Sequence, residues 1–339
     1  MWQKRIVTLI VLSVCLLTGG IWLVAHGHRP IVISAASAGE TDEGILAALQ
    51  EGCANAVSAI RSGSGQATVY FWSKGADGRI LETEAKDDLK FKGDQFLLRE
   101  NVKYLRDDLV SGKGPSEPPS PTMRTAATSY DLEEVTILDQ FDSLEAQARI
   151  CDPTGSRGKN SINLYKSHVA IVGHGVAYLV PRPGVLPSFV ELASVKVAGR
   201  ETINGDECIM VDVVTTVHLP KPGEGTITVT DTARKWVNPQ KGYTIVRTQV
   251  WSEGSVYGAK TLVTEINTTV RQYETGVWGP EEVTYQQYDL KGEITQKMVT
   301  TYDSAFKLNV PISDGDLTLT LPSGTEVHNE LIDAEYTVP

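Results

Sequence analysis

One amphipathic helix followed by strand after strand is the pattern that dominates this chain of 339 residues. Apolar side chains recur at helical three-and-four spacing from Ile45 to Ile60, directly after Thr41 and Asp42, which suit a helix cap. From residue 66 onward the sequence is typical of strands separated by glycine, asparagine and proline turns. Because these strands do not alternate with helices, the pattern argues against the parallel sheet of nucleotide-binding folds.

Two turns divide the second half of the chain into hairpins. Asn204-Gly205 is a strong hairpin signal, and Asn238-Pro239-Gln240-Lys241-Gly242 offers a proline start and a permissive glycine. Strict alternation predicts two sets of residues that each share a face of the sheet. One set is Ile209, Val211, Val213 and Val217, and the other is Tyr243, Ile245, Arg247, Gln249 and Trp251.

A long antiparallel sheet must curl, and a helix with one apolar face can cover its concave side. We therefore expect a mainly β (α+β) fold, in which a curved antiparallel sheet forms an open half-barrel and the N-terminal helix and short helices cover the concave face. Residues 39–339 are expected to form a single domain, with a proline-rich insertion at 111–128 and a strand extension after residue 311. Residues 139–150 are predicted to form a second, weaker helix, and 316–321 a strand.

The N-terminus indicates export. Lys4 and Arg5 precede an uncharged apolar run at 6–25, which is long enough to span a bilayer. A small-residue site, Ala36-Ser37-Ala38, also permits cleavage, so residues 1–38 are either a signal peptide or an anchor in the inner membrane with a short linker. Both alternatives stay open, and both place the rest of the chain in a periplasmic or extracytoplasmic compartment.

The charge balance argues against a nucleic-acid partner. Residues 39–339 carry 28 basic and 42 acidic side chains, a formal charge of −14. A surface that acidic repels phosphate backbones.

Catalytic and metal-binding motifs are absent from the sequence. It contains no Gly-x-Ser-x-Gly, His-Glu-x-x-His or Cys-x-x-Cys pattern. The stretch 155–160 lacks the glycine spacing of a phosphate loop, and His168 and His174 have no further ligands nearby in the sequence. We expect no cofactor, no metal and no enzymatic activity.

The exported part holds three cysteines, Cys53, Cys151 and Cys208. An odd number permits one disulfide and leaves at least one thiol free, and the pairing stays open. Buried thiols that behave as small hydrophobic groups are the favoured interpretation.

Three stretches resemble the periplasmic lipoprotein-carrier proteins of the LolA/LolB type. "VKVAGRETINGDECIMVDVV" is similar to a hairpin of that family, and "RKWVNPQKGYTIVRTQVW" to its Trp-x-(Asp/Asn)-Pro-x-x-Gly hairpin. "GVWGPEEVTYQQYD" and "FKLNVP" are similar to its closing strands, so the resemblance covers residues 190–312. In an early strand the carriers have Arg-Pro-Gly-x-Phe-Arg-Trp, whereas this chain has Phe91-Lys92-Gly93-Asp94-Gln95-Phe96, and the family's functional arginine is therefore not carried over.

The resemblance implies a half-barrel that binds a lipid or the acyl chains of a lipoprotein in the cell envelope. An alternative is a membrane-anchored envelope sensor or scaffold that binds a protein partner through the same half-barrel. The aromatic candidates for the lining of a lipid site are Phe71, Trp72, Phe96, Tyr178, Trp236 and Trp251, with Pro181–Pro187 as a lid. Ordinary core packing is the competing role for each of them, and the neighbours Phe71 and Trp72 cannot both face inward from a regular strand.

Overall fold

The computed structural model describes residues 41–108, 123–141, 145–155, 179, 189–220, 225–254 and 257–339. The contacts between these residues divide the chain into two compact units. Of the described residues, the first unit holds 41–59, 179, 189–220, 225–254, 257–272 and 276–294, and the second unit holds 60–108, 123–141, 145–155, 273–275 and 295–339.

The first unit is an antiparallel meander with one helix. Its elements are α2 (Asp42–Ala59), β7 (Val190–Ile203), β8 (Asp206–Pro220), β9 (Thr226–Asn238), β10 (Thr244–Gly254), β11 (Gly258–Gln272) and β12 (Trp278–Tyr288). The strands lie in chain order from β7 to β12, and each pairs antiparallel with the next. Each strand therefore pairs with its neighbour in sequence, as the turn signals predicted.

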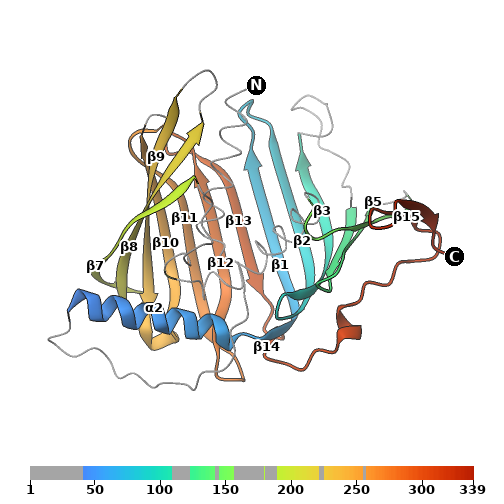
Figure 1. Ribbon diagram of the computed structural model, residues 1–339, viewed down its shortest axis with the longest axis horizontal. Coiled ribbons are helices and arrows are strands. Elements are labelled where there is room, and N and C mark those ends of the chain that lie inside the picture. The colour runs from blue at the N-terminus through green and yellow to red at the C-terminus, as the bar shows by residue number, and fades with distance from the viewer. Residues whose placement is uncertain are drawn as a thin grey trace. The chain divides into compact units, whose positions relative to one another are not determined.

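Helix α2 forms where the apolar spacing predicted it. The Thr41 hydroxyl accepts a hydrogen bond from the Gly44 N–H at 3.3 Å, and Asp42 and Glu43 place negative charge at the positive N-terminal end. In Figure 1 the helix crosses strands of the first unit, and its apolar face packs against them.

The two predicted turns are confirmed. Asn204 and Gly205 both have positive φ, 52° and 89°, as a two-residue hairpin turn requires. The second turn is the 3₁₀ helix η1 (Pro239–Lys241), where the Asn238 side chain accepts hydrogen bonds from two backbone N–H groups at 3.0 and 3.1 Å. Gly242 ends this turn in the left-handed region, with φ of 67°.

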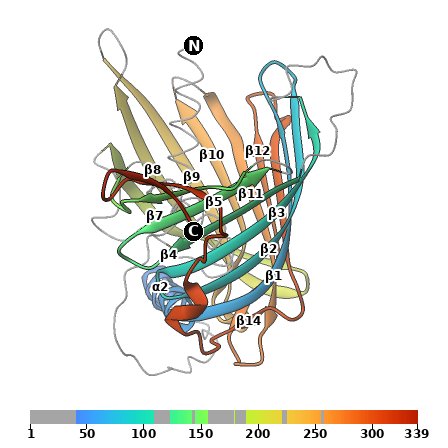
Figure 2. The ribbon, with the colours of Figure 1, turned by 90° about the vertical axis from the view of Figure 1, so that its right-hand side faces the viewer.

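The second unit is also built mainly of antiparallel strands. They are β1 (Ser62–Lys74), β2 (Ile80–Lys92), β3 (Gln95–Asp107), β4 (Met123–Tyr130), β5 (Val135–Phe141), β6 (Gln147–Cys151), β13 (Ile294–Tyr302), β14 (Lys307–Leu308), β15 (Glu326–Asn329) and β16 (Ala334–Thr337). Their order is β16-β15-β6-β5-β4-β3-β2-β1-β13, and β14 also pairs with β1. Strand β15 runs parallel to β6. Figure 2 shows the bend of the long strands β1 to β3.

The predicted fold class is confirmed. The described part of the chain is mainly strand, has one α-helix near the N-terminus, and forms an open, curved sheet. The strand order ends at β7 in the first unit and at β16 in the second, so the described strands do not close on themselves.

Two local predictions were wrong. Residues 139–150 contain the end of β5 and most of β6 instead of a helix, because Ala148 and Ile150 alternate onto one face and pack with Val327. Residues 316–321 contain no strand, because the 3₁₀ helix η2 (Asp314–Leu317) begins just before them. The Asp316 carboxylate accepts a hydrogen bond from the Ser313 N–H at 3.0 Å and holds this turn.

All three cysteines of the described residues are buried free thiols. Cys53 and Cys208 belong to the first unit and Cys151 to the second. The favoured interpretation of the three as buried thiols is confirmed.

Candidate functional site

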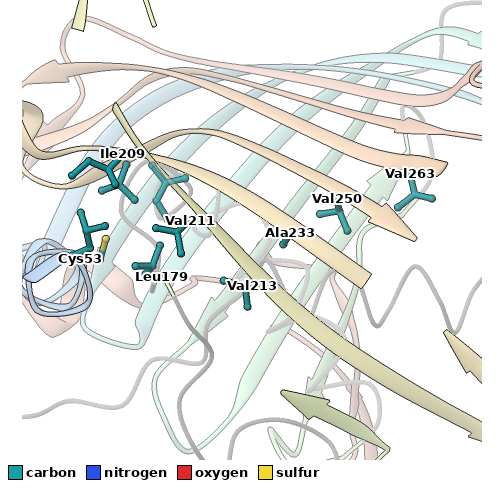
Figure 3. Close-up of a cluster of buried hydrophobic side chains, with 11 residues drawn as sticks. Cys53, Leu179, Ile209, Val211, Val213, Ala233, Val250 and Val263 are labelled. Atoms are coloured by element: carbon teal, nitrogen blue, oxygen red, sulfur yellow. The ribbon is translucent and has the colours of Figure 1, made fainter. Parts of the chain in front are cut away.

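The sheet of the first unit has two faces of different chemistry. We call the side that packs on α2 the helix face and the opposite side the far face. The helix face carries a continuous apolar cluster, formed by Leu49, Cys53, Leu179, Ile209, Val211, Val213, Ala233, Val237, Ile245, Val250 and Val263. In Figure 3 the cluster runs from Cys53, Ile209 and Val211 beside the helix to Val250 and Val263, which lie well away from it.

Helix α2 lies very close to this face. A methyl group added at Gly52 would come within 2.4 Å of the Tyr243 ring, so only a residue without a side chain fits there. On the next residue, the Cys53 thiol donates a hydrogen bond to the Tyr243 carbonyl at 3.4 Å. The helix is therefore seated on the turn between β9 and β10.

A lysine interrupts the apolar helix face. Lys235 lies between Ala233 and Val237 on the same face of β9, and only 5% of it is exposed. Its cross-strand partners are Val211 of β8 and Thr248 of β10. The spacing of Val229, Asp231, Ala233, Lys235 and Val237 in the sequence already carries this signal, but the sequence-based search for catalytic motifs missed it.

Burial shifts the pKa values of Lys235 and of the Cys53 thiol on α2. Loss of solvent disfavours the ammonium ion and lowers the pKa of Lys235 to about 8, although the nearby Cys53 opposes this shift. The same loss of solvent raises the pKa of Cys53 to about 12, so its thiol stays protonated at neutral pH. The site therefore pairs a cation with a neutral thiol donor.

A second polar group lies four residues before Lys235 on the same strand and face. The buried Asp231 carboxylate accepts a hydrogen bond from Ser252 at 2.5 Å. Burial raises the pKa of Asp231, and the Ser252 hydrogen bond acts in the opposite direction. Burial also raises the pKa of Tyr257, which shares Ser252, to about 12. Four strand residues span roughly 13 Å, so Asp231 and Lys235 are well separated.

The far face holds two tryptophans of the β9–β10 hairpin. Trp236 and Trp251 belong to one cluster with Cys208, Met210 and Val246. The indole N–H of Trp236 donates to Glu201 at 2.8 Å, and the Arg247 guanidinium lies 5.0 Å from its ring centroid. Trp251 is flanked by Arg234 and Lys260, at 5.8 and 5.2 Å from its ring centroid. Contacts within the protein thus account for the positions of both indole rings.

A β-bulge explains why strict alternation predicts the wrong faces for the side chains of β10. Ile245 pairs with Val237, and Arg247 pairs with Trp236, so Val246 is an extra residue in the strand. Ile245 therefore packs on the helix face, while Trp251 packs on the far face. The prediction that Ile245 and Trp251 share a face is wrong.

The other aromatic candidates lie in the second unit or outside the described residues. In the second unit, Phe96 is completely buried and its ring lies 5.9 Å from that of Tyr130. Phe71 and Trp72, neighbours in β1 and both half-buried, point to opposite faces of that strand. Tyr178 and the expected lid at Pro181–Pro187 lie outside the described residues.

The second unit contains its own buried acid. Asp87 of β2 pairs across the sheet with Glu100 of β3, and burial, with the Glu100 charge as the smaller cause, raises its pKa to about 8. In the same unit Arg124 forms two hydrogen bonds with Asp139, at 2.7 and 2.8 Å. These groups neighbour apolar strand residues and fit a structural role for the network.

The part of the chain that the structure describes contains no group of three or more histidine, cysteine, aspartate or glutamate side chains placed to hold a metal ion. His168 and His174 lie outside it. None of the helices within the described ranges is both long enough and apolar enough to cross a membrane, and the run at 6–25 is not among those ranges.

No family model and no curated protein matches the sequence. Among solved structures, a DUF1329 family protein from Desulfovibrio piger is 14% identical with a TM-score of 0.38, over 80% of this chain and 96% of that one. A LolA superfamily protein from Nitrosomonas europaea is 13% identical with a TM-score of 0.35, over 80% and 97% of the two chains. The lipoprotein LppX of Mycobacterium tuberculosis is 11% identical with a TM-score of 0.28, over 79% and 97%.

Proposed function

We propose that this protein binds a lipid, or the acyl chains of a lipoprotein, in the cell envelope, and that it does so without catalysis. The observation that carries the proposal is the continuous apolar cluster of the helix face, which extends from α2 out to Val263. Apolar side chains over several neighbouring strands suit a long hydrocarbon chain better than a compact polar substrate.

The apolar burial on such a face supplies a large part of the free energy of binding. Each buried methylene contributes about 0.8 kcal/mol, so a chain of about 12 methylenes contributes roughly 10 kcal/mol. Association costs on the order of 4–15 kcal/mol, so apolar burial alone leaves at most about 6 kcal/mol of net binding free energy, which corresponds to weak affinity. A polar contact at the head of the ligand would increase that affinity.

The apolar segment at 6–25 supports an extracytoplasmic location. In the proposal the chain works in the periplasm or an equivalent compartment, either released after cleavage or anchored in the inner membrane. Residues 39–339 form the binding part. Measuring the mass of the mature chain, purified from envelope fractions, distinguishes the two forms.

The test of binding uses the full chain, purified from envelope fractions and analysed by native mass spectrometry and lipid extraction. Acyl species should co-purify at a stoichiometry near one, and a fatty-acid probe with a diazirine in its chain should crosslink to α2, β8, β9 and β10. A purified chain that retains no acyl species and shows no saturable binding of the probe would contradict the proposal. Crosslinks restricted to the far face would contradict its location.

An envelope sensor or scaffold with a protein partner is the second candidate. Its support is a set of exposed apolar side chains on the β15–β16 hairpin. Leu331 and Ile332 in the turn are 45% and 67% exposed, and Tyr336 in β16 is 44% exposed. Exposed apolar groups on one hairpin are typical of a protein contact. Replacing Leu331 and Ile332 with serine separates the candidates, because it should abolish a protein contact and leave lipid binding unchanged.

A further inference from the structure

We infer that Lys235 receives the acid group of the bound ligand, and that the ligand is a single-chain carboxylic acid whose tail lies along the helix face. This inference rests on the proposed function and names the chemical class of its ligand. It depends on where Lys235 lies in the apolar cluster, on its neighbours and on the direction in which the cluster extends.

Lys235 lies near the end of the cluster where the helix crosses the sheet. It pairs with Val211, which Figure 3 shows beside Cys53 and close to α2. Ala233 lies two residues before Lys235 on the same face of β9. Its cross-strand partners are Val213 of β8 and Val250 of β10, and Val263 of β11 follows in the same cluster. A head group at Lys235 therefore places an attached chain along small apolar side chains that lead away from the helix.

Polar neighbours around Lys235 suit a carboxylate. The Thr248 side chain is its direct partner on β10, and partners in an antiparallel pair have Cβ atoms about 4.5–5.5 Å apart. The Cys53 thiol on α2 is close enough to interact electrostatically with the ammonium group. The ammonium group of Lys235 and the hydroxyl of Thr248 are donors, and an ionised carboxylate is an acceptor with two oxygens.

The positive charge at this end of the site matches a ligand head group that carries one negative charge. Lys235 contributes one positive charge, which equals in magnitude the single negative charge of a carboxylate. A phosphate monoester carries about −1.5 to −2 at pH 7 and would leave buried negative charge uncompensated. A fatty acid therefore matches the site better than an alkyl phosphate.

The experiment compares the full-length wild-type chain with Lys235→Met, which keeps an unbranched side chain one atom shorter and removes the charge. The probes are palmitic acid, hexadecanol and hexadecyl phosphate at pH 7. We expect the wild type to bind palmitic acid at least tenfold more tightly than hexadecanol, and Lys235→Met to lose that preference while its affinity for hexadecanol changes less than twofold. Lys196→Met, which changes an exposed lysine in β7, is the matched control and should behave as the wild type.

The outcomes separate this inference from the proposed function. A wild type that binds neither the acid nor the alcohol contradicts the proposed function. Equal wild-type affinity for the acid and the alcohol, or undiminished acid binding by a folded Lys235→Met variant, overturns the inference and leaves lipid binding intact. A wild-type preference for hexadecyl phosphate over palmitic acid also overturns it.

A pH titration of the wild type tests the same point without a substitution. Affinity for palmitic acid should fall as the pH rises from 7 to 10, because the free protein loses the ammonium proton in that range, and hexadecanol binding should not change. The titratable Cys53 on α2 acts on the charge of Lys235, and the cross-strand partners on β8 and β10, Val211 and Thr248, do not titrate. A flat profile for the acid would count against Lys235 as its receptor.

Discussion

At the scale of single residues, Lys235 carries a charge that its surroundings disfavour. Its pKa is lowered from 10.5 to about 8 in the folded protein. Between these two values the unfolded chain holds more protons than the folded one, so this group makes stability rise with pH across that window. Below pH 8 both states are protonated and the unfavourable contribution is complete.

This shift gives a testable stability profile. We expect the free energy of unfolding of the ligand-free wild type to rise relative to Lys235→Met by roughly 2–3 kcal/mol between pH 7.5 and 10.5, since one pKa unit corresponds to about 1.4 kcal/mol. Chemical denaturation at a series of pH values measures the difference. A difference that does not change over this range would show that the lysine is solvated in the folded state.

The thiols give a second prediction at this scale. Burial raises the pKa of Cys53 to about 12 and that of Cys208 to about 11, and only the thiolate is nucleophilic. Iodoacetamide at pH 8 should therefore label Cys53 and Cys208 at least 100-fold more slowly in the native protein than in denaturant, and burial should slow the labelling of Cys151 as well. Peptide mass spectrometry measures each site separately. Rapid native labelling of Cys53 alone would show that α2 leaves the sheet readily.

At the scale of elements, the seating of α2 depends on a glycine. A methyl group at Gly52 would overlap the Tyr243 ring at 2.4 Å, and Tyr243 itself has a φ of 59°, which glycine adopts without strain. Gly52→Ala should destabilise the protein by about 1–3 kcal/mol through overpacking. Glu51→Ala, at an exposed helix position, is the control and should change stability by less than about 0.5 kcal/mol.

A double variant tests whether this contact is the cause. Tyr243→Gly removes the ring, so the cost of Gly52→Ala should largely disappear in the Tyr243→Gly background. Thermal denaturation of the four proteins gives the coupling energy directly. Additive effects of the two substitutions would show that the helix is seated by other contacts.

The elements were predicted best where a local signal decided their conformation. The capping residues before α2, the Asn204-Gly205 turn and the Asn238–Gly242 turn are set by side-chain chemistry that acts over a few residues. Residues 139–150 were mistaken for a helix because an isolated segment does not show its strand partners, β4 and β15. Pairing across the sheet overrode the weak helical pattern.

The candidate site was less predictable than the fold. A bulge at Val246 moved Trp251 to the far face, and bulges depend on how two strands pair, which composition does not reveal. Aromatic residues were chosen as the lining for their size, whereas the helix face is lined mainly by valine, isoleucine and leucine. The position of Lys235 could have been found by following the alternation of β9 in both directions from Ala233.

At the scale of the whole molecule, the helix face belongs to the first compact unit, and the buried Asp87 of β2 belongs to the second. Each unit has its own apolar clusters, so each has the means to respond to a ligand by itself. The proposed site lies entirely in the first unit. Ligand binding should therefore stabilise that unit first.

Hydrogen exchange tests this localisation. At a fatty-acid concentration 100 times the dissociation constant, binding stabilises the folded state by about 2.7 kcal/mol, which corresponds to a slowing of about 100-fold for amides that exchange through opening of the bound region. We expect this slowing in α2, β8, β9 and β10 and no change in β2, β3 and β4. At the same concentration, a tenfold loss of affinity in Lys235→Met reduces the slowing to about tenfold. Equal protection of both units would contradict a response confined to the first unit.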